Sequence, residues 1–469
     1  MTATPQGITR NLAEFAASLT YGDLPKEVAE RTKLLILDVS GIMVRARHDA
    51  ESTDSLVGAV ERLGLVKGER SNDACSVLGD TRGYAPTAAA LLNGALAHSL
   101  DFDDTHAEAS LHSSAPIVPA VLAAAEMVDA SGRDVITACV VGYEIQIRIA
   151  EALVPRDHYD RGYHPTATCG TLAAAAAAGK ILGLDADGVE SALGIALSQA
   201  AGSMQFLADG AWTKRSHVGQ AAQNGLICAT MAAEGFKGPK QALEGKWGFL
   251  HAYSPNPRPD KATEGLGTDW LTMELGVKPF PSCRYTHAAM DAIRKLQADH
   301  GITADTIESL ECGVPETGWK IVGEGAGKQT PGSVVDGQFS MPFCGAVVLK
   351  TGTMVWDDYK THLTDADTLA LVKKVTCVVD KDAEASFPAK MAGKATVKTK
   401  SGETYSAFIE VPKGEPDNFM SLGEFRAKFD GLCAPYLTKD GLDKFAGAIL
   451  GLENAKSVRS VLALSGGGA

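Results

Sequence analysis

The stretch that decides the fold runs from Thr166 to Gly179 and reads Thr-Ala-Thr-Cys-Gly-Thr-Leu-Ala-Ala-Ala-Ala-Ala-Ala-Gly. Alanine has the highest intrinsic helix propensity, and side chains this small let neighbouring helices approach closely. The stretch is shorter than the roughly 20 apolar residues that a membrane-spanning helix needs. It therefore predicts a thin helix, apolar on most sides, inside a helical domain.

Helical periodicity surrounds this stretch and predicts one helix after another up to about residue 267. These predictions include helices at 133–153 and 239–247, and a helix that begins near Val218. Period-two alternation appears further along the chain. It predicts strands at 307–314 and 372–380, and a hairpin whose two runs flank Ser401-Gly402.

Helices return after the hairpin, so the α+β part interrupts a helical chain. The predicted fold class is mainly α with α+β: a large all-helical domain plus a smaller inserted α+β lid domain. The predicted boundaries are 1–267 for the first helical part, 268–412 for the lid and 413–469 for the helical return.

Composition excludes several classes of protein. The chain has 469 residues, with 44 Lys and Arg against 57 Asp and Glu, which gives a net charge of −13. Such an acidic chain is not expected to bind nucleic acid, which needs clustered cations. We expect no signal peptide and no membrane span, because no apolar block of suitable length is present. The nine cysteines form no CxxC pair, which favours a reducing cytoplasm.

The first cluster of chemically versatile side chains is Asp101-Phe-Asp-Asp-Thr-His-Ala-Glu-Ala-Ser-Leu-His112. A carboxylate beside a histidine can orient the imidazole and raise its pKa, which makes a general acid/base pair. The same groups are ligands for divalent metals. Helix capping and solvated charge are a third explanation, and spacing alone leaves all three open.

Three further clusters carry cations or histidines. His164 comes directly before a helix that Pro165 begins, where free N–H groups suit an anion; a loop carbonyl could equally occupy this histidine. Trp212-Thr-Lys-Arg-Ser-His217 and Lys278-Pro-Phe-Pro-Ser-Cys-Arg-Tyr-Thr-His287 are either binding loops for carboxylates or ordinary surface and linker segments. We find no Walker loop, HExxH or GxSxG motif, and therefore expect no cofactor and no metal.

The order of these clusters resembles the MmgE/PrpD family over nearly the whole chain. The resemblance rests on Leu100-Asp-Phe-Asp-Asp-Thr, Tyr163-His-Pro-Thr, Thr213-Lys-Arg-Ser-His-Val-Gly and Lys278-Pro-Phe-Pro-Ser-Cys. The family contains 2-methylcitrate dehydratases, cis-aconitate decarboxylases and iminodisuccinate epimerases. The resemblance implies a homodimer whose active site lies between the helical domain and the lid.

Carried over by position, the resemblance implies site roles for Asp101, Thr105, His112, His164, Lys214 and Lys278. We expect His164 and Lys214 to be the base/acid pair, and Asp101 to orient His112 or Lys214. The expected substrate contacts are Thr105, Tyr143, Arg148, Lys278, Arg284 and His287, with His112 as a further carboxylate contact. Met341 stands where some members use a tyrosine.

The shared chemistry is the loss or gain of a proton at a carbon next to a carboxylate. The leading prediction is a cofactor-independent epimerase of a small dicarboxylate, of the iminodisuccinate type. The alternative is a lyase on a tricarboxylate, of the cis-aconitate decarboxylase or 2-methylcitrate dehydratase type. A non-catalytic protein, whose polar clusters are caps and surface loops, is the rival from another class.

Overall fold

The computed structural model describes residues 7–208 and 210–466, which form two compact units. The first unit lies within residues 7–276 and 422–466, and the second comprises residues 277–421. These breaks lie a few residues later in the chain than the predicted 267 and 412. The predicted fold class, mainly α with α+β, is confirmed, because helices dominate the first unit and a sheet with helices forms the second.

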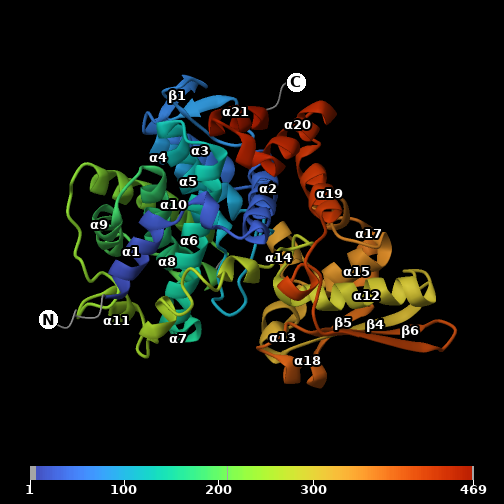
Figure 1. The fold of residues 1–469 in the computed structure, drawn as a ribbon. Coiled ribbons are helices and arrows are strands. Elements are labelled where there is room, and N and C mark those ends of the chain that lie inside the picture. Colours follow the sequence, from blue (N-terminus) through green and yellow to red (C-terminus); the bar gives the residue numbers. More distant parts are fainter. Residues whose placement is uncertain (1–6, 209, 467–469) are drawn as a thin grey trace. The chain divides into compact units, whose positions relative to one another are not determined.

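Helix α8 (Pro165–Ile181) is the alanine-rich stretch, and it is almost wholly buried within the first unit (Figure 1). It packs against α10, α6, α5 and α9. The other helices of this unit are α1 (Ile8–Ser18), α2 (Lys26–Asp49), α3 (Thr53–Arg62), α4 (Pro86–Ala97), α5 (Ser114–Val128), α6 (Gly132–Leu153), α7 (Pro155–Asp160), α9 (Ala186–Leu197), α10 (Thr213–Ala233), α11 (Phe249–Tyr253), α19 (Leu422–Cys433), α20 (Lys439–Leu450) and α21 (Val458–Leu462).

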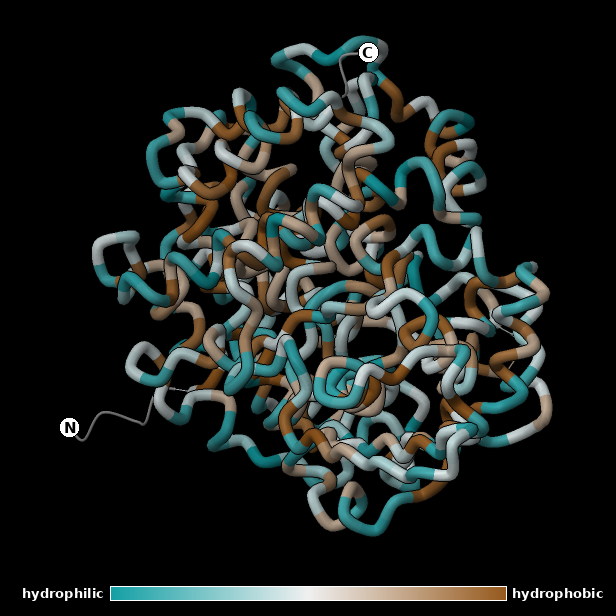
Figure 2. The backbone as a smooth tube through the Cα atoms, turned by 90° about the vertical axis from the view of Figure 1, so that its right-hand side faces the viewer, coloured by the Kyte–Doolittle hydropathy of each residue, from teal (hydrophilic) through white to brown (hydrophobic). Residues whose placement is uncertain are grey.

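Small residues set the distance between α10 and its neighbours. A methyl group at Gly225 would lie 2.4 Å from Ala174 Cβ of α8, and one at Gly219 would lie 2.3 Å from the Leu91 carbonyl oxygen of α4. Both distances are far below van der Waals contact, so α10 fits between α4 and α8 only because these positions lack a side chain. Figure 2 shows hydrophobic stretches of backbone running through the interior and hydrophilic loops at the edge.

Three local predictions for this unit were wrong. The unit is not all-helical: β1 (Val66–Glu69), β2 (Cys75–Ser76) and β3 (Arg82–Tyr84) form a small antiparallel sheet in the order β1-β3-β2. Strands this short leave no alternation for a sequence pattern to detect. Residues 239–247 form turns, in which Glu244 accepts hydrogen bonds from the Thr9 backbone and hydroxyl. Helix α10 begins at Thr213, one turn earlier than predicted.

The second unit is a four-stranded sheet covered by helices. The strands β4 (Ile307–Val314), β5 (Val375–Val379), β6 (Gly393–Thr399) and β7 (Thr404–Ile409) pair in the order β5-β4-β6-β7, with only β4 and β5 parallel. The helices are α12 (His287–His300), α13 (Glu316–Val322), α14 (Val334–Gln338), α15 (Met341–Thr351), α16 (Asp357–His362), α17 (Ala366–Val372) and α18 (Lys381–Ser386). The predicted hairpin is β6 and β7.

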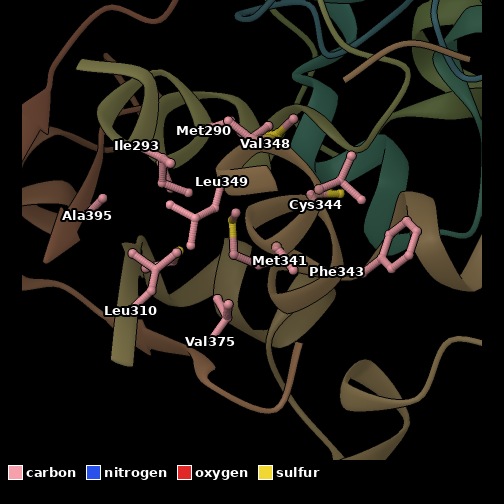
Figure 3. Close-up of a cluster of buried hydrophobic side chains, with 14 of the residues drawn as sticks. Met290, Ile293, Leu310, Met341, Phe343, Cys344, Val348, Leu349, Val375 and Ala395 are labelled. Carbon is pink, nitrogen blue, oxygen red and sulfur yellow. The ribbon is translucent and has the colours of Figure 1, made fainter. Parts of the chain in front are cut away.

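The core of this unit lies where α12 and α15 cover the sheet (Figure 1). Figure 3 shows Ile293 of α12 and Leu349 of α15 near Leu310 of the sheet. Met341 is fully buried in this apolar cluster (Figure 3). It stabilises the core by burying its side chain.

Candidate active site

The loop between α4 and α5 carries the first cluster and is held by backbone hydrogen bonds. Thr105 and Gly276 exchange two N–H···O bonds of 2.8 Å, and the His106 N–H donates to the Leu111 carbonyl at 2.9 Å. Asp101 adopts a left-handed backbone conformation with φ of 52°, which is strained for a residue with a side chain. The fixed loop turns most of its polar side chains inward, while the Thr105 side chain remains half-buried.

Asp103 joins two histidines of this loop. Its Oδ2 atom lies 2.7 Å from His98 Nδ1 and 3.4 Å from His112 Nδ1. His112 Nδ1 also lies 2.7 Å from the Asp104 carbonyl oxygen, which only accepts, so this nitrogen carries the proton. The two rings meet edge to face with centroids 4.7 Å apart. Burial lowers the pKa of His98, although Asp103 opposes the shift.

Asp104 points to the other side of the loop and stabilises the start of α5. It accepts hydrogen bonds from the Ser114 backbone N–H and hydroxyl, the latter at 2.8 Å. Ser114 Oγ in turn lies 2.9 Å from the hydroxyl of Tyr143, which is fully buried. Burial, together with the charge of Asp103, raises the pKa of Asp104 to about 7. These contacts give Tyr143 a supporting role beneath the loop.

Asp101 forms an ion pair with Lys214, with 2.9 Å between Oδ1 and Nζ. Of the two partners that the sequence left open for Asp101, the structure places Lys214 in contact. Because α10 begins at Thr213, Lys214 and His217 lie about one helical turn apart on the same helix. The earlier start of this helix therefore places an ammonium group and an imidazole side by side.

His164, the residue before α8, pairs with His217. His164 Nδ1 lies 2.8 Å from His217 Nε2, and the His164 ring centroid lies 5.8 Å from that of His98. Burial, then the neighbouring histidines and Lys214, hold the pKa of His164 well below its usual value. Burial also lowers the pKa of His217 to about 3. Both rings are therefore neutral at pH 7, and one donates its N–H to the other.

These contacts bring four of the expected site residues into one cluster: Asp101, His112, His164 and Lys214. Sequence reasoning missed three members, which are His98, Asp103 and His217. Asp103 and His217 belonged to clusters that were singled out, but nothing in the sequence assigned them a partner. His98 lies at the end of an apolar helix, where it reads as a core residue. The sequence offered one indication that His98 could belong to the site, namely that Asp103 follows it by only five residues.

Arg148 lies on α6, where backbone carbonyls surround its guanidinium group. It donates to the carbonyl of Asp269 at 2.6 Å and to that of Glu264, and its Nη2 lies 3.2 Å from Glu144 Oε2. Glu144 itself accepts from the Thr272 hydroxyl at 2.6 Å. Arg148 thus secures the segment that leads out of the first unit, and we leave it out of the proposed substrate contacts.

Lys278, Arg284 and His287 belong to the second unit. Arg284 donates to Glu415 Oε1 at 2.7 Å through Nε, and its Nη1 lies 2.9 Å from His287 Nδ1. His287 Nε2 lies 3.2 Å from the Ser282 carbonyl oxygen, so Nε2 donates and Nδ1 accepts. Glu415 offsets the charge of Arg284, and Lys278 is buried. Their contacts with a substrate stay predictions.

The His98–Asp103–His112 group also has the composition of a metal site. One ligand atom from each residue lies within 4.8 Å of the others, and no second such group of three occurs in residues 7–208 and 210–466. The 2.7 Å contact between His98 and Asp103, however, is a hydrogen-bond distance, and the His112 Nδ1 proton is donated to a carbonyl. We therefore interpret the group as a hydrogen-bonded chain.

A buried cluster of histidines, carboxylates and a lysine on a helical scaffold is typical of one class of protein, the enzymes that transfer protons. Comparison with known families agrees. The MmgE/PrpD N-terminal domain matches residues 10–262, and the MmgE/PrpD C-terminal domain matches residues 280–453. The chain belongs to the MmgE/PrpD family. Within the part of the chain that the structure describes, no helix combines the length and apolar character needed to cross a bilayer.

The similar curated proteins are cis-aconitate decarboxylases. The chain is 32% identical to the cis-aconitate decarboxylase-like protein oryM of Aspergillus oryzae, over 99% of this chain and 98% of the relative. It is 29% identical to the cis-aconitate decarboxylase of Aspergillus terreus, over 98% and 96% of the two chains. The human cis-aconitate decarboxylase is also 29% identical, over 96% and 92%. The comparisons thus favour the lyase alternative over the epimerase.

Proposed function

We propose that this chain is a lyase that removes CO₂ from a small tricarboxylate of the cis-aconitate class. The observation that carries the proposal is one cluster of acid/base side chains. It contains the Lys214–Asp101 ion pair, whose charges act on His98, and the neighbouring rings of His112 and His164. His98 is also hydrogen-bonded to Asp103. Near full-length similarity to cis-aconitate decarboxylases supports the choice of reaction. The chain's own decarboxylation activity and its expected homodimeric state stay proposals.

The reaction breaks the bond between a carbon atom and one carboxylate, whose carbon leaves as CO₂. The electron pair of that bond stays on the remaining carbon skeleton, where it delocalises across the double bond onto a neighbouring carboxylate. One proton then adds to carbon. A tricarboxylate and one proton thus become CO₂ and a dicarboxylate, and the site must supply a proton donor and offset the charge that develops.

Lys214 is the proposed proton donor. Its ammonium group is held 2.9 Å from Asp101 Oδ1, which fixes its position on the first turn of α10. His164 is the proposed carboxylate contact: its imidazole is neutral, and when its Nδ1 accepts from His217, its Nε2–H can donate without placing excess positive charge in a buried site. This division keeps the predicted acid role of Lys214 and gives His164 a binding role in place of the base.

The iminodisuccinate-type epimerase is the second candidate. Epimerisation needs a base as well as an acid, and the neutral ring of His164 could accept a proton from carbon. That single observation favours the epimerase, whereas the similar curated proteins favour the lyase. The two reactions differ in whether a carbon–carbon bond breaks.

The test is incubation of the purified protein with ¹³C-labelled cis-aconitate, followed by NMR detection of CO₂ and a dicarboxylate. Lys214→Met should lower kcat by about 10²–10⁴-fold. The matched control Lys240→Met replaces an exposed lysine of the same unit and should leave kcat unchanged. Absence of CO₂ with cis-aconitate, combined with deuterium at the α-carbon of iminodisuccinate in D₂O, would reject the lyase and support the epimerase.

A further inference from the structure

His98 is a buried histidine to which neither the sequence nor the proposed reaction gives a role. It follows the last residue of α4 and is 2% exposed. Its Nδ1 lies 2.7 Å from Asp103 Oδ2, so in the neutral ring Nδ1 carries the proton and Nε2 presents a lone pair. Across residues 7–208 and 210–466, this Nε2 atom finds no hydrogen-bond partner. A buried polar atom of this kind is costly unless a ligand completes it.

The rings around His98 place its imidazole among the residues of the candidate site. The His98 centroid lies 4.7 Å from that of His112 and 5.8 Å from that of His164. Both neighbours are engaged at Nδ1, by the Asp104 carbonyl and by His217 respectively. His98 differs from them because its Nδ1 lies 2.7 Å from Asp103 Oδ2, whereas His112 Nδ1 lies 3.4 Å from the same oxygen. An imidazolium at this position would therefore be stabilised by Asp103.

The charged groups around His98 explain why it holds no second proton before a ligand binds. Lys214 of α10 opposes a positive charge on His98, whereas Asp101 and Asp103 of its own loop favour one. His164 and His217 are neutral. The further groups near Asp103 are Asp104, whose pKa is raised to about 7, and Asp38 of α2, which is paired with Lys428 of α19. Burial of the ring outweighs the favourable charges.

We propose that His98 is a carboxylate-binding residue that takes up one proton from solution as the ligand binds. The polycarboxylate then contacts an imidazolium whose Nδ1–H is held by Asp103 and whose Nε2–H donates to the ligand. The inference rests on the proposed function in one respect, the polycarboxylate nature of the ligand. Each carboxylate that enters offsets the repulsion from Lys214, so protonation of His98 and binding favour one another.

The coupling between protonation of His98 and ligand binding predicts how the affinity changes with pH. When binding takes up one proton, the apparent Kd rises about tenfold for each unit that the pH increases above the pKa of the free site. Without uptake by the protein, affinity for a fully ionised ligand stays nearly constant over the same range. Proton uptake can be counted directly, because the heat of binding then depends on the ionisation enthalpy of the buffer.

The experiment is isothermal titration of the full-length protein with citrate in Tris and in HEPES, between pH 7 and 8.5. The wild type should take up about one proton per citrate. His98→Asn keeps an N–H that can donate to Asp103 but cannot titrate, so uptake and the pH slope should both disappear. His362→Asn, at a buried histidine of the second unit that also lies near carboxylates, should behave as the wild type.

Asp103→Asn provides a second variant in case His98→Asn fails to fold, and it should also reduce uptake. Uptake that persists in a folded His98 or Asp103 variant, or wild-type binding without uptake, would overturn this inference while decarboxylation of cis-aconitate could still be observed. Uptake that depends on His98 without any decarboxylation would instead leave the inference standing and reject the proposed function. Failure of citrate to bind would overturn the inference, whereas the proposed function would be decided by CO₂ release from cis-aconitate alone.

Discussion

Lys428 of α19 anchors the loop that carries the candidate active site, and its replacement should measurably destabilise the first unit. Its Nζ atom lies 2.7 Å from Asp38 Oδ1 and donates to the Phe102 carbonyl at 2.9 Å. It also lies 3.8 Å from the centroid of the Phe102 ring. The side chains of Lys428 and Asp38 are only 4% and 3% exposed. A segment from the end of the chain thus holds the residue next to Asp101.

The expected cost of Lys428→Met follows from what the change leaves behind. Methionine keeps the apolar stem but leaves the Asp38 carboxylate buried without its counter-charge, and burial already raises the pKa of Asp38. Removing one partner of a buried ion pair costs about 3–5 kcal/mol. At roughly 2 °C per kcal/mol for a large domain, the melting temperature should fall by about 6–10 °C.

Thermal unfolding followed by circular dichroism measures this effect, with Lys444→Met as the control. Lys444 pairs with Asp440 at 2.6 Å, but the two side chains are 61% and 73% exposed, so little change is expected. Adding Asp38→Leu to Lys428→Met should restore most of the stability, because an apolar pair replaces a lone buried charge. Equal effects of the buried and exposed substitutions would refute the reasoning.

Three further predictions concern the site. Asp101→Asn should reduce kcat by at least tenfold at an unchanged melting temperature, since it frees the Lys214 ammonium from its 2.9 Å contact; unchanged turnover would contradict the assignment. Lowering the pH below about 6.5 should destabilise the fold. His217 then binds a proton in the unfolded chain but stays neutral in the native protein, where its pKa is lowered to about 3. A series of melting temperatures from pH 7.5 to 5 should therefore fall less steeply in His217→Asn. Dialysis against EDTA should leave turnover intact, because the 2.7 Å contact between His98 Nδ1 and Asp103 Oδ2 is a hydrogen bond; lost activity that zinc restores would show a metal site.

The sequence alone predicted the parts of the fold that depend on local pattern. Alanine propensity and a proline at the first helical position predicted α8, and period-two alternation around Ser401-Gly402 predicted β6 and β7. The residues of the first cluster were also identified as chemically important. Each of these inferences uses neighbours within one or two turns of the chain, where spacing determines which side chains share a face.

Only the tertiary structure decided which of these side chains meet. His164 meets His217, and Lys214 meets Asp101, because α4, α8 and α10 pack closely, and Gly219 and Gly225 permit that approach. The conformation of the loop between α4 and α5 brings Asp103 to His98. Packing also determines the protonation state of His164 and His217, because burial lowers their pKa values and keeps both rings neutral. Local sequence contains no measure of burial, and it left two possible partners for Asp101 and none for His98 or His217, so the actual pairs and their protonation required the tertiary structure.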